Sequence, residues 1–218
     1  MWNGKNPGWL QFLEKRMQWL AIPHIAILFV TLQALGFLMV MSDPIWIDRL
    51  ALLPSAVLQG QYWRLVTFLA LPLSLSPIWV IFTLWFIYFI LNTIETEWGA
   101  FKTTLYVLVS IILTIAVSFI FDYPVLQVSD FESTLFLAAA ALFPEMEIRL
   151  FLAIPVKMKW LAWFALAFLA VRFFGADWIG RIFLIAIYSN YLVFFGPAQL
   201  DRIKQMMRRH NFKRKMRR

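Results

Sequence analysis

Long apolar runs decide what this chain can fold into. Between Leu20 and Met41 the sequence contains no Asp, Glu, Lys or Arg, and further apolar runs recur as far as Phe195. A helical run of about twenty apolar residues matches the hydrocarbon core of a bilayer. Because 62% of the 218 residues are hydrophobic and only 15% are charged, the sequence predicts an integral membrane protein rather than a soluble domain.

Six apolar spans can be placed along the chain. Their expected ranges are about 20–41, 65–92, 102–121, 131–143, 158–174 and 178–195. Pro72 is expected to divide the second span into a bent start and a continuous helix from about Pro77, because proline donates no backbone hydrogen bond. The predicted fold class is all-α, a polytopic membrane protein with a six-helix bundle.

The fourth span is unusually short for a membrane helix. Its thirteen residues would reach roughly 20 Å at helical rise, less than a full hydrocarbon core. Four consecutive alanines, Ala138 to Ala141, permit neighbouring helices to approach closely. We therefore expect this helix to lie at the centre of the bundle.

Two segments flank the expected membrane domain, which covers residues 20–197. Residues 1–19 combine Trp and Phe side chains with Lys15 and Arg16, which is typical of an amphipathic helix on the membrane face. Residues 198–218 hold nine of the twenty Lys and Arg residues and are expected to form a basic cytoplasmic tail. This tail is expected to contact anionic lipid rather than nucleic acid, because Phe212 is its only aromatic residue.

The distribution of positive charge predicts the orientation. If both termini are cytoplasmic, sixteen Lys and Arg residues lie in cytoplasmic segments, and the outer segments hold only Arg49, Arg64, Arg172 and Arg181. Cytoplasmic loops of membrane proteins carry such an excess. We expect both termini in the cytoplasm and a bacterial inner membrane, with the endoplasmic reticulum membrane as the alternative.

Few residues in the sequence could supply thiol or imidazole chemistry. The absence of cysteine excludes disulfides, thiol nucleophiles and Cys-based zinc sites, and His24 and His210 are the two histidines. His24 lies near the start of the first span and is interpreted as an interfacial polar group. No cofactor and no metal site are predicted.

A short aromatic and basic segment precedes the second span. In residues 60–67, Gly-Gln-Tyr-Trp-Arg-Leu-Val-Thr, Arg64 follows Tyr62 and Trp63 directly. Aromatic rings favour the headgroup level of a membrane, and a long Arg side chain can reach phosphate or water from there. We expect Trp63 and Arg64 to lie at the membrane surface and to contact lipid or a partner protein.

These motifs resemble those of a known family. Residues 60–67, before a membrane helix that closes with Ile94-Glu95, resemble the start of the second helix of the rhomboid superfamily, including its derlin branch. Leu142-Phe143-Pro144 and the Ile-Pro-Val-Lys-Met-Lys-Trp segment at 154–160 are similar to the end of the fourth helix and the start of the fifth. Asp177-Trp178-Ile179-Gly180 looks like the opening of the sixth. The resemblance covers about residues 42–196, in order, and implies a rhomboid-like bundle.

The resemblance also locates where a catalytic site would be. Rhomboid proteases use a Gly-x-Ser-Gly serine on the fourth helix and a histidine on the sixth, because a serine hydroxyl needs a base. Ser129 and Ser133 lie in the corresponding region without that motif, and Ile185 falls at the histidine position. Trp79 and Thr83 fall at the positions of the oxyanion-binding pair. The chain is therefore expected to be a pseudoprotease without the serine/histidine dyad, and not an enzyme.

Four residues are the candidates for binding a partner or lipid: Trp63, Arg64, Glu132 and Ser133. A purely structural role is the alternative for two of them, with Arg64 bonded to loop carbonyls and Glu132 capping the fourth helix. The resemblance to derlins implies that the protein binds transmembrane segments of clients or partner subunits, as an adaptor in membrane protein quality control that works with a membrane protease or its regulator. The alternatives are a structural subunit of a membrane complex and a divergent intramembrane serine protease with Glu132 as base.

Overall fold

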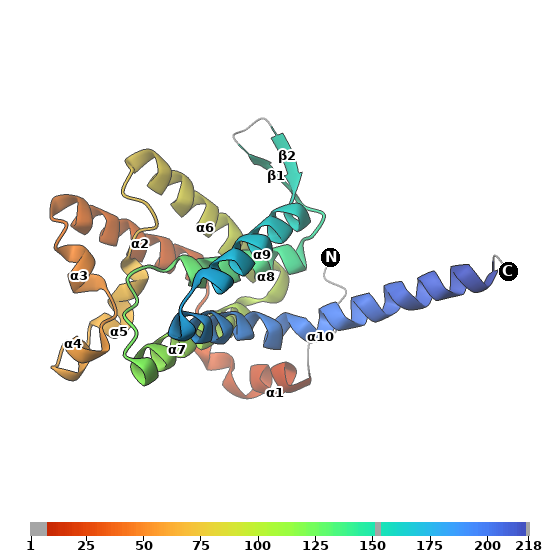
Figure 1. The fold of residues 1–218 in the computed structure, drawn as a ribbon, viewed down its shortest axis with the longest axis horizontal. Helices are drawn as coiled ribbons and strands as arrows, with labels where there is room; N and C mark the ends of the chain where they lie inside the picture. Colours follow the sequence, from red (N-terminus) through yellow and green to blue (C-terminus); the bar gives the residue numbers. More distant parts are fainter. Residues whose placement is uncertain (1–7, 151–153, 217–218) are drawn as a thin grey trace.

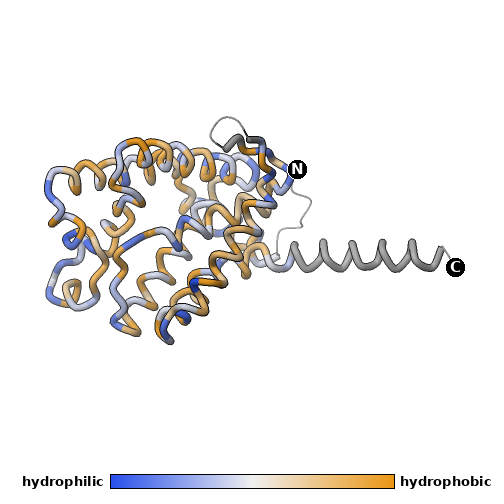
Figure 2. Tube along the Cα trace, turned by 45° about the horizontal axis from the view of Figure 1, so that its top comes forward, coloured by the Kyte–Doolittle hydropathy of each residue, from blue (hydrophilic) through white to orange (hydrophobic). Residues whose placement is uncertain are grey.

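The computed structural model describes residues 8–150 and 154–216 and is mostly helical (Figure 1). Its long helices are α2 (Ile25–Ser42), α6 (Pro77–Trp98), α7 (Ala100–Phe121), α9 (Met158–Gly175) and α10 (Trp178–Met216). Four of these and the Trp178–Pro197 part of α10 are long and apolar enough to cross a membrane. Figure 2 shows apolar residues along the helices and hydrophilic residues at many of their connections. An integral membrane protein fits these five helices.

The short helix α8 (Ser129–Leu142) lies among the long ones. It has 14 residues, roughly 21 Å at 1.5 Å per residue, and packs against α6, α9 and α10. Ala138 and Ala139 are fully buried, and so is most of the helix. The predicted central position of the fourth span is therefore confirmed. The prediction of six full spans is not, because α8 is too short to count as one by its length alone.

The N-terminal part departs from the predicted boundary. Helix α1 (Gly8–Met17) falls inside the predicted interfacial segment, and a 3-10 turn covers Gln18–Leu20. The prediction that the first span starts near residue 20 is wrong, since α2 begins at Ile25. Pro23 disfavours helix for the residue before it, and His24 adopts a left-handed conformation with φ 58°.

Three short helices form the connection between α2 and α6: α3 (Trp46–Leu50), α4 (Pro54–Leu58) and α5 (Arg64–Thr67). They lie together at one end of the molecule (Figure 1) and, as predicted, none is long enough to cross a bilayer. A 3-10 turn, Phe68–Ala70, then packs on α2. A Cβ atom at Gly36 would lie 1.8 Å from the Ala70 carbonyl oxygen, so only glycine permits this approach.

The all-α prediction missed one β-hairpin. Strands β1 (Glu147–Leu150) and β2 (Ile154–Lys157) pair antiparallel, with Ile148 opposite Val156. Isoleucine and valine favour extended backbone, and Ile148 is buried. The segment predicted as an approach to the fifth helix is therefore a strand, although α9 begins at Met158 as expected.

Helix α10 is longer than predicted. The sixth span was expected to end near Phe195, but the helix continues through Pro197 to Met216 and extends away from the bundle (Figure 1). A proline inside a helix removes one backbone hydrogen bond without necessarily ending the helix. The predicted boundary between membrane domain and tail therefore falls within one helix.

Candidate functional site

Polar side chains tie α8 to its neighbours. Gln33 Nε2 on α2 donates a hydrogen bond to Glu132 Oε1. Arg172 on α9 pairs with Asp130 through both carboxylate oxygens, the Nη2 to Oδ2 distance being 3.2 Å. Tyr106 on α7 donates from its hydroxyl to the Thr134 carbonyl at 3.0 Å. A helix buried in an apolar bundle gains specific positions for its side chains from such contacts.

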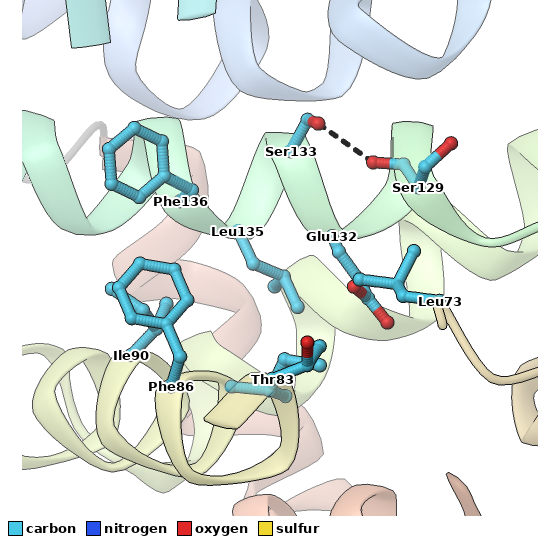
Figure 3. A pocket seen from close by; sticks show the side chains of 10 residues that line it. Leu73, Thr83, Phe86, Ile90, Ser129, Glu132, Ser133, Leu135 and Phe136 are labelled. Atoms are coloured by element: carbon cyan, nitrogen blue, oxygen red, sulfur yellow. Dashed lines mark hydrogen bonds between the residues drawn. The ribbon is translucent and has the colours of Figure 1, made fainter. Parts of the chain in front are cut away.

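A cavity of about 250 Å³ lies between α6 and α8 (Figure 3). Its walls are mainly apolar, with Glu132, Thr83, Ser129 and Ser133 as the polar contributors. Figure 3 shows the Glu132 side chain directed from α8 toward α6. The complete lining is Leu73, Thr83, Phe86, Ile87, Ile90, Ser129, Glu132, Ser133, Leu135 and Phe136.

A second cavity, of about 280 Å³, lies on the other side of α8. Ser129 and Ser133 also line it, together with Arg172 of α9 and Tyr188 of α10. The Ser133 hydroxyl donates to the Ser129 carbonyl at 2.7 Å, an ordinary contact within a helix (Figure 3). The Asp130 carboxylate near this cavity is held by Arg172. The Tyr188 side chain interacts with the Ser133 hydroxyl, and the described lining of this cavity includes no carboxylate and no imidazole.

Glu132 and Ser133 diverge from the helix, although they are adjacent in sequence. Figure 3 shows the carboxylate pointing toward Thr83 and the Ser133 hydroxyl pointing away from it. Successive residues on an α-helix are turned about 100° from one another, so adjacent side chains do not face each other. In this geometry the Glu132 carboxyl group does not face the Ser133 hydroxyl and cannot take its proton directly.

The residues at the positions expected for the oxyanion-binding pair and for the histidine differ in their surroundings. Trp79 is 52% exposed, and the Thr83 hydroxyl donates to the Trp79 carbonyl at 2.8 Å. Ile185 is 59% exposed and does not line either cavity. Tyr188, one turn further along α10, is the residue that shares a cavity with the serines. Counting along the sequence therefore missed the side chain of α10 that faces them.

Arg64 and Trp63 have separate environments. Arg64 is buried, with Nη1 donating to the carbonyls of Asp48 and Ala51 and Nε donating to Gln61 Oε1 at 2.7 Å. These bonds hold the loop around α3 and α5, which corresponds to the structural role considered for Arg64. Trp63 is 56% exposed. Of this pair, only Trp63 presents most of its surface for contact with lipid or a partner.

His24 lies far from the serines. Its backbone N–H donates to Glu95 Oε1 at 2.8 Å, near the end of α6. Glu95 is twelve residues beyond Thr83, a separation of roughly 18 Å along the helix axis. His210 lies outside the side chains that the structure describes. Within the described residues there is also no cluster of three or more His, Cys, Asp or Glu that could hold a metal ion.

An apolar groove of about 280 Å³ runs between α6 and α9. Its exposed aromatic side chains include Phe82, Trp85 and Phe164, which are 44%, 56% and 74% exposed. The groove shares Phe86 and Phe136 with the cavity that contains Glu132. The two hollows are therefore neighbours, separated by these two rings.

Several site residues were not predicted from the sequence. Gln33, Asp130, Arg172 and Tyr188 all contact or surround the candidate residues of α8. Two of the four carry a signal in the sequence: Gln33 is a lone amide within an apolar run, and Arg172 lies at the end of another. Polar groups in membrane helices usually face the protein interior and find partners there.

Comparison with known proteins adds no assignment to these observations. No family model matches the chain, and no curated protein and no solved structure matches it.

Proposed function

We propose that this protein is a non-catalytic, rhomboid-like membrane protein that binds transmembrane segments of clients or partner subunits. In this proposal it acts as an adaptor in membrane protein quality control, in a bacterial inner membrane with both termini cytoplasmic. The sequence resemblance of residues 42–196 supplies the family, and the chemistry of α8 supplies the argument against catalysis.

The observation that supports the proposal most is the direction of the Glu132 side chain. It bonds Gln33 and points toward α6, away from the Ser133 hydroxyl (Figure 3). A serine nucleophile needs a base within hydrogen-bond reach, about 2.6–3.2 Å. His24 is near Glu95, and Asp130 is paired with Arg172. This arrangement favours binding over hydrolysis.

The groove between α6 and α9 is the surface that we assign to clients. Phe82, Trp85 and Phe164 offer large, exposed apolar contacts there. Packing between membrane helices depends on van der Waals contact and on hydrogen bonds, both of which this groove and its neighbouring cavity offer. A client helix would cross the bilayer alongside α6 and α9.

Affinity purification in mild detergent, followed by mass spectrometry, tests the proposed function. The expected result is a varied set of membrane proteins recovered with the wild type and depleted with Trp85→Ala. Ser129→Ala and Ser133→Ala should recover the same set, without accumulating uncleaved forms. Cleavage products that disappear in either serine variant would establish the divergent protease instead.

A structural subunit is the second candidate, and the exposure of α9 favours it. Met158 is the one residue of α9 that is buried. Such a surface could be covered permanently by one partner instead of a succession of clients. Recovery of a single partner at fixed stoichiometry in the same purification would support this candidate over the adaptor.

A further inference from the structure

Glu132 brings an unpaired carboxylate oxygen to the wall of the cavity between α6 and α8. The residue is only 8% exposed; its Oε1 accepts from Gln33, and its Oε2 has no hydrogen-bond partner. Buried polar atoms are nearly always satisfied, so this atom needs an explanation. The capping role considered as the alternative for Glu132 is not observed, since Oε1 bonds the Gln33 side chain and Oε2 bonds no group.

The walls around Glu132 do not supply the missing donor. The Thr83 hydroxyl, the nearest polar group on α6, donates to the Trp79 carbonyl at 2.8 Å. The Ser133 hydroxyl donates to the Ser129 carbonyl. Figure 3 shows the Ser129 side chain directed away from the Glu132 carboxylate, and the remaining lining side chains are apolar. A hydrogen-bond donor for Oε2 must therefore come from a molecule that enters the cavity.

Size and hydrogen-bonding capacity select the class of molecule. An apolar cavity of about 150 Å³ accepts a benzene ring, so about 250 Å³ accepts one large side chain. The free carboxyl oxygen of Glu132 can accept a hydrogen bond from an ammonium or amide N–H, which the phosphate of a lipid headgroup does not carry. Apolar walls around one acceptor suit a side chain with a long apolar stem and a donor at its tip, as in lysine or glutamine.

The route into the cavity leads from the apolar groove. Phe86 of α6 and Phe136 of α8 line both hollows, and their ring centroids are 6.0 Å apart. A helix lying in the groove would need to extend a single side chain past these rings to reach Glu132.

We propose that Glu132 recognises a lysine or glutamine side chain projecting from a membrane helix seated between α6 and α9. This inference rests on the proposed function and adds a selection rule to it: preferred clients carry a hydrogen-bond donor within their apolar span. Such residues are costly in lipid, so an assembled protein usually hides them, and an unassembled one exposes them.

Binding of synthetic membrane peptides to the full chain in phosphatidylcholine nanodiscs tests this recognition. The probes share one Leu-Ala sequence, and a single Lys or Gln occupies each position of one helical turn in separate peptides. We expect the best-placed Lys or Gln peptide to bind about 5- to 30-fold more tightly than the all-apolar peptide, as for one hydrogen bond between membrane helices. Glu132→Leu should abolish this preference, and Glu132→Gln should reduce it.

Glu95→Gln is the matched control, because Glu95 Oε2 also lacks a hydrogen-bond partner but lies outside the cavity. It should leave the preference intact. Equal binding of donor and apolar peptides to the wild type would overturn the inference and leave the proposed function standing. Failure of every peptide to bind would overturn both. A preference that disappears when phosphatidylethanolamine is added would assign the cavity to a lipid amine and would also overturn the inference.

Discussion

Helices α8 and α9 follow one another in the chain and have opposite surroundings. Eleven of the 14 residues of α8 are buried, whereas α9 buries only Met158. The shorter helix depends on protein contacts, since it cannot match the thickness of a bilayer, and the longer one presents most of its surface outward. The comparison indicates that changes in α8 should act on folding and changes in α9 on binding.

Removal of Asp130 should have the largest effect on stability. Asp130→Leu leaves Arg172 without its carboxylate partner. We expect a loss of about 3 kcal/mol, the low end of the range for buried pairs, because the Arg172 side chain retains 34% exposure. Reversible unfolding in mixed micelles measures this loss. The double variant Asp130→Leu/Arg172→Leu should recover part of it; no recovery would mean that the pair is not coupled.

Replacing a buried alanine of α8 with a larger residue should have the next largest effect on stability. Ala139 is fully buried, and Ala139→Leu inserts three carbons into close packing. We expect destabilisation of about 2 kcal/mol, as for other overpacked interiors. Ala167→Leu in α9 is the matched control, since Ala167 is exposed, and it should change stability by less than about 0.5 kcal/mol. Similar losses for both variants would show that α8 and α9 do not differ in this way.

A substitution in the groove should separate binding from folding. Phe164 is 74% exposed and lines the groove, so Phe164→Ala should lower client recovery several-fold and leave unfolding unchanged within about 0.5 kcal/mol. Phe174→Ala, at an exposed position outside the groove, is the control and should recover clients normally. Equal recovery with both variants would move the client surface away from the groove.

The smallest effect concerns the hairpin between α8 and α9. Lys159 and Lys157 bond Glu145 at 2.7 and 3.0 Å and lower the pKa of that carboxyl group. Because the pKa is lowered in the folded state, this contribution is present above the ordinary pKa of glutamate and is lost as the pH falls through the lowered value. The protection factors of the β1 and β2 amides, which compare each exchange rate with that of the unfolded chain at the same pH, should therefore be constant near neutral pH and fall under acidic conditions.

Glu145→Gln should remove that acid sensitivity. Glu147→Gln removes the same charge from a residue of β1 without breaking these bonds, so it should leave the sensitivity in place. Identical exchange profiles for both variants would show that the Glu145 contacts do not hold the hairpin.

Much of the helical architecture could be predicted from apolar runs. Proline at position 77 starts α6, Gly99 with φ 90° separates α6 from α7, and the alanine run places α8 centrally. These features are local, so they are visible in the sequence. The ends of α2 and α10 were not predicted, because Pro23 delays one helix and Pro197 fails to stop the other.

The polar contacts of the site were beyond sequence reasoning. Gln33 and Glu132 are 99 residues apart, and Asp130 and Arg172 are 42 apart, so their pairing depends on how the helices pack. Arg64 was expected at the membrane surface but bonds loop carbonyls, because three short helices close around it. The direction of Glu132 away from Ser133 likewise became evident only in three dimensions.

Intact-mass analysis of a bound membrane peptide tests the central claim most directly. The wild-type protein, reconstituted in nanodiscs with a peptide that it captures, is incubated and the peptide mass is followed over time. We predict that the peptide remains bound and uncleaved, because Glu132 points away from both serine side chains and no imidazole is among the described residues that line either cavity. Cleavage by the wild type that Ser129→Ala or Ser133→Ala eliminates would contradict the claim.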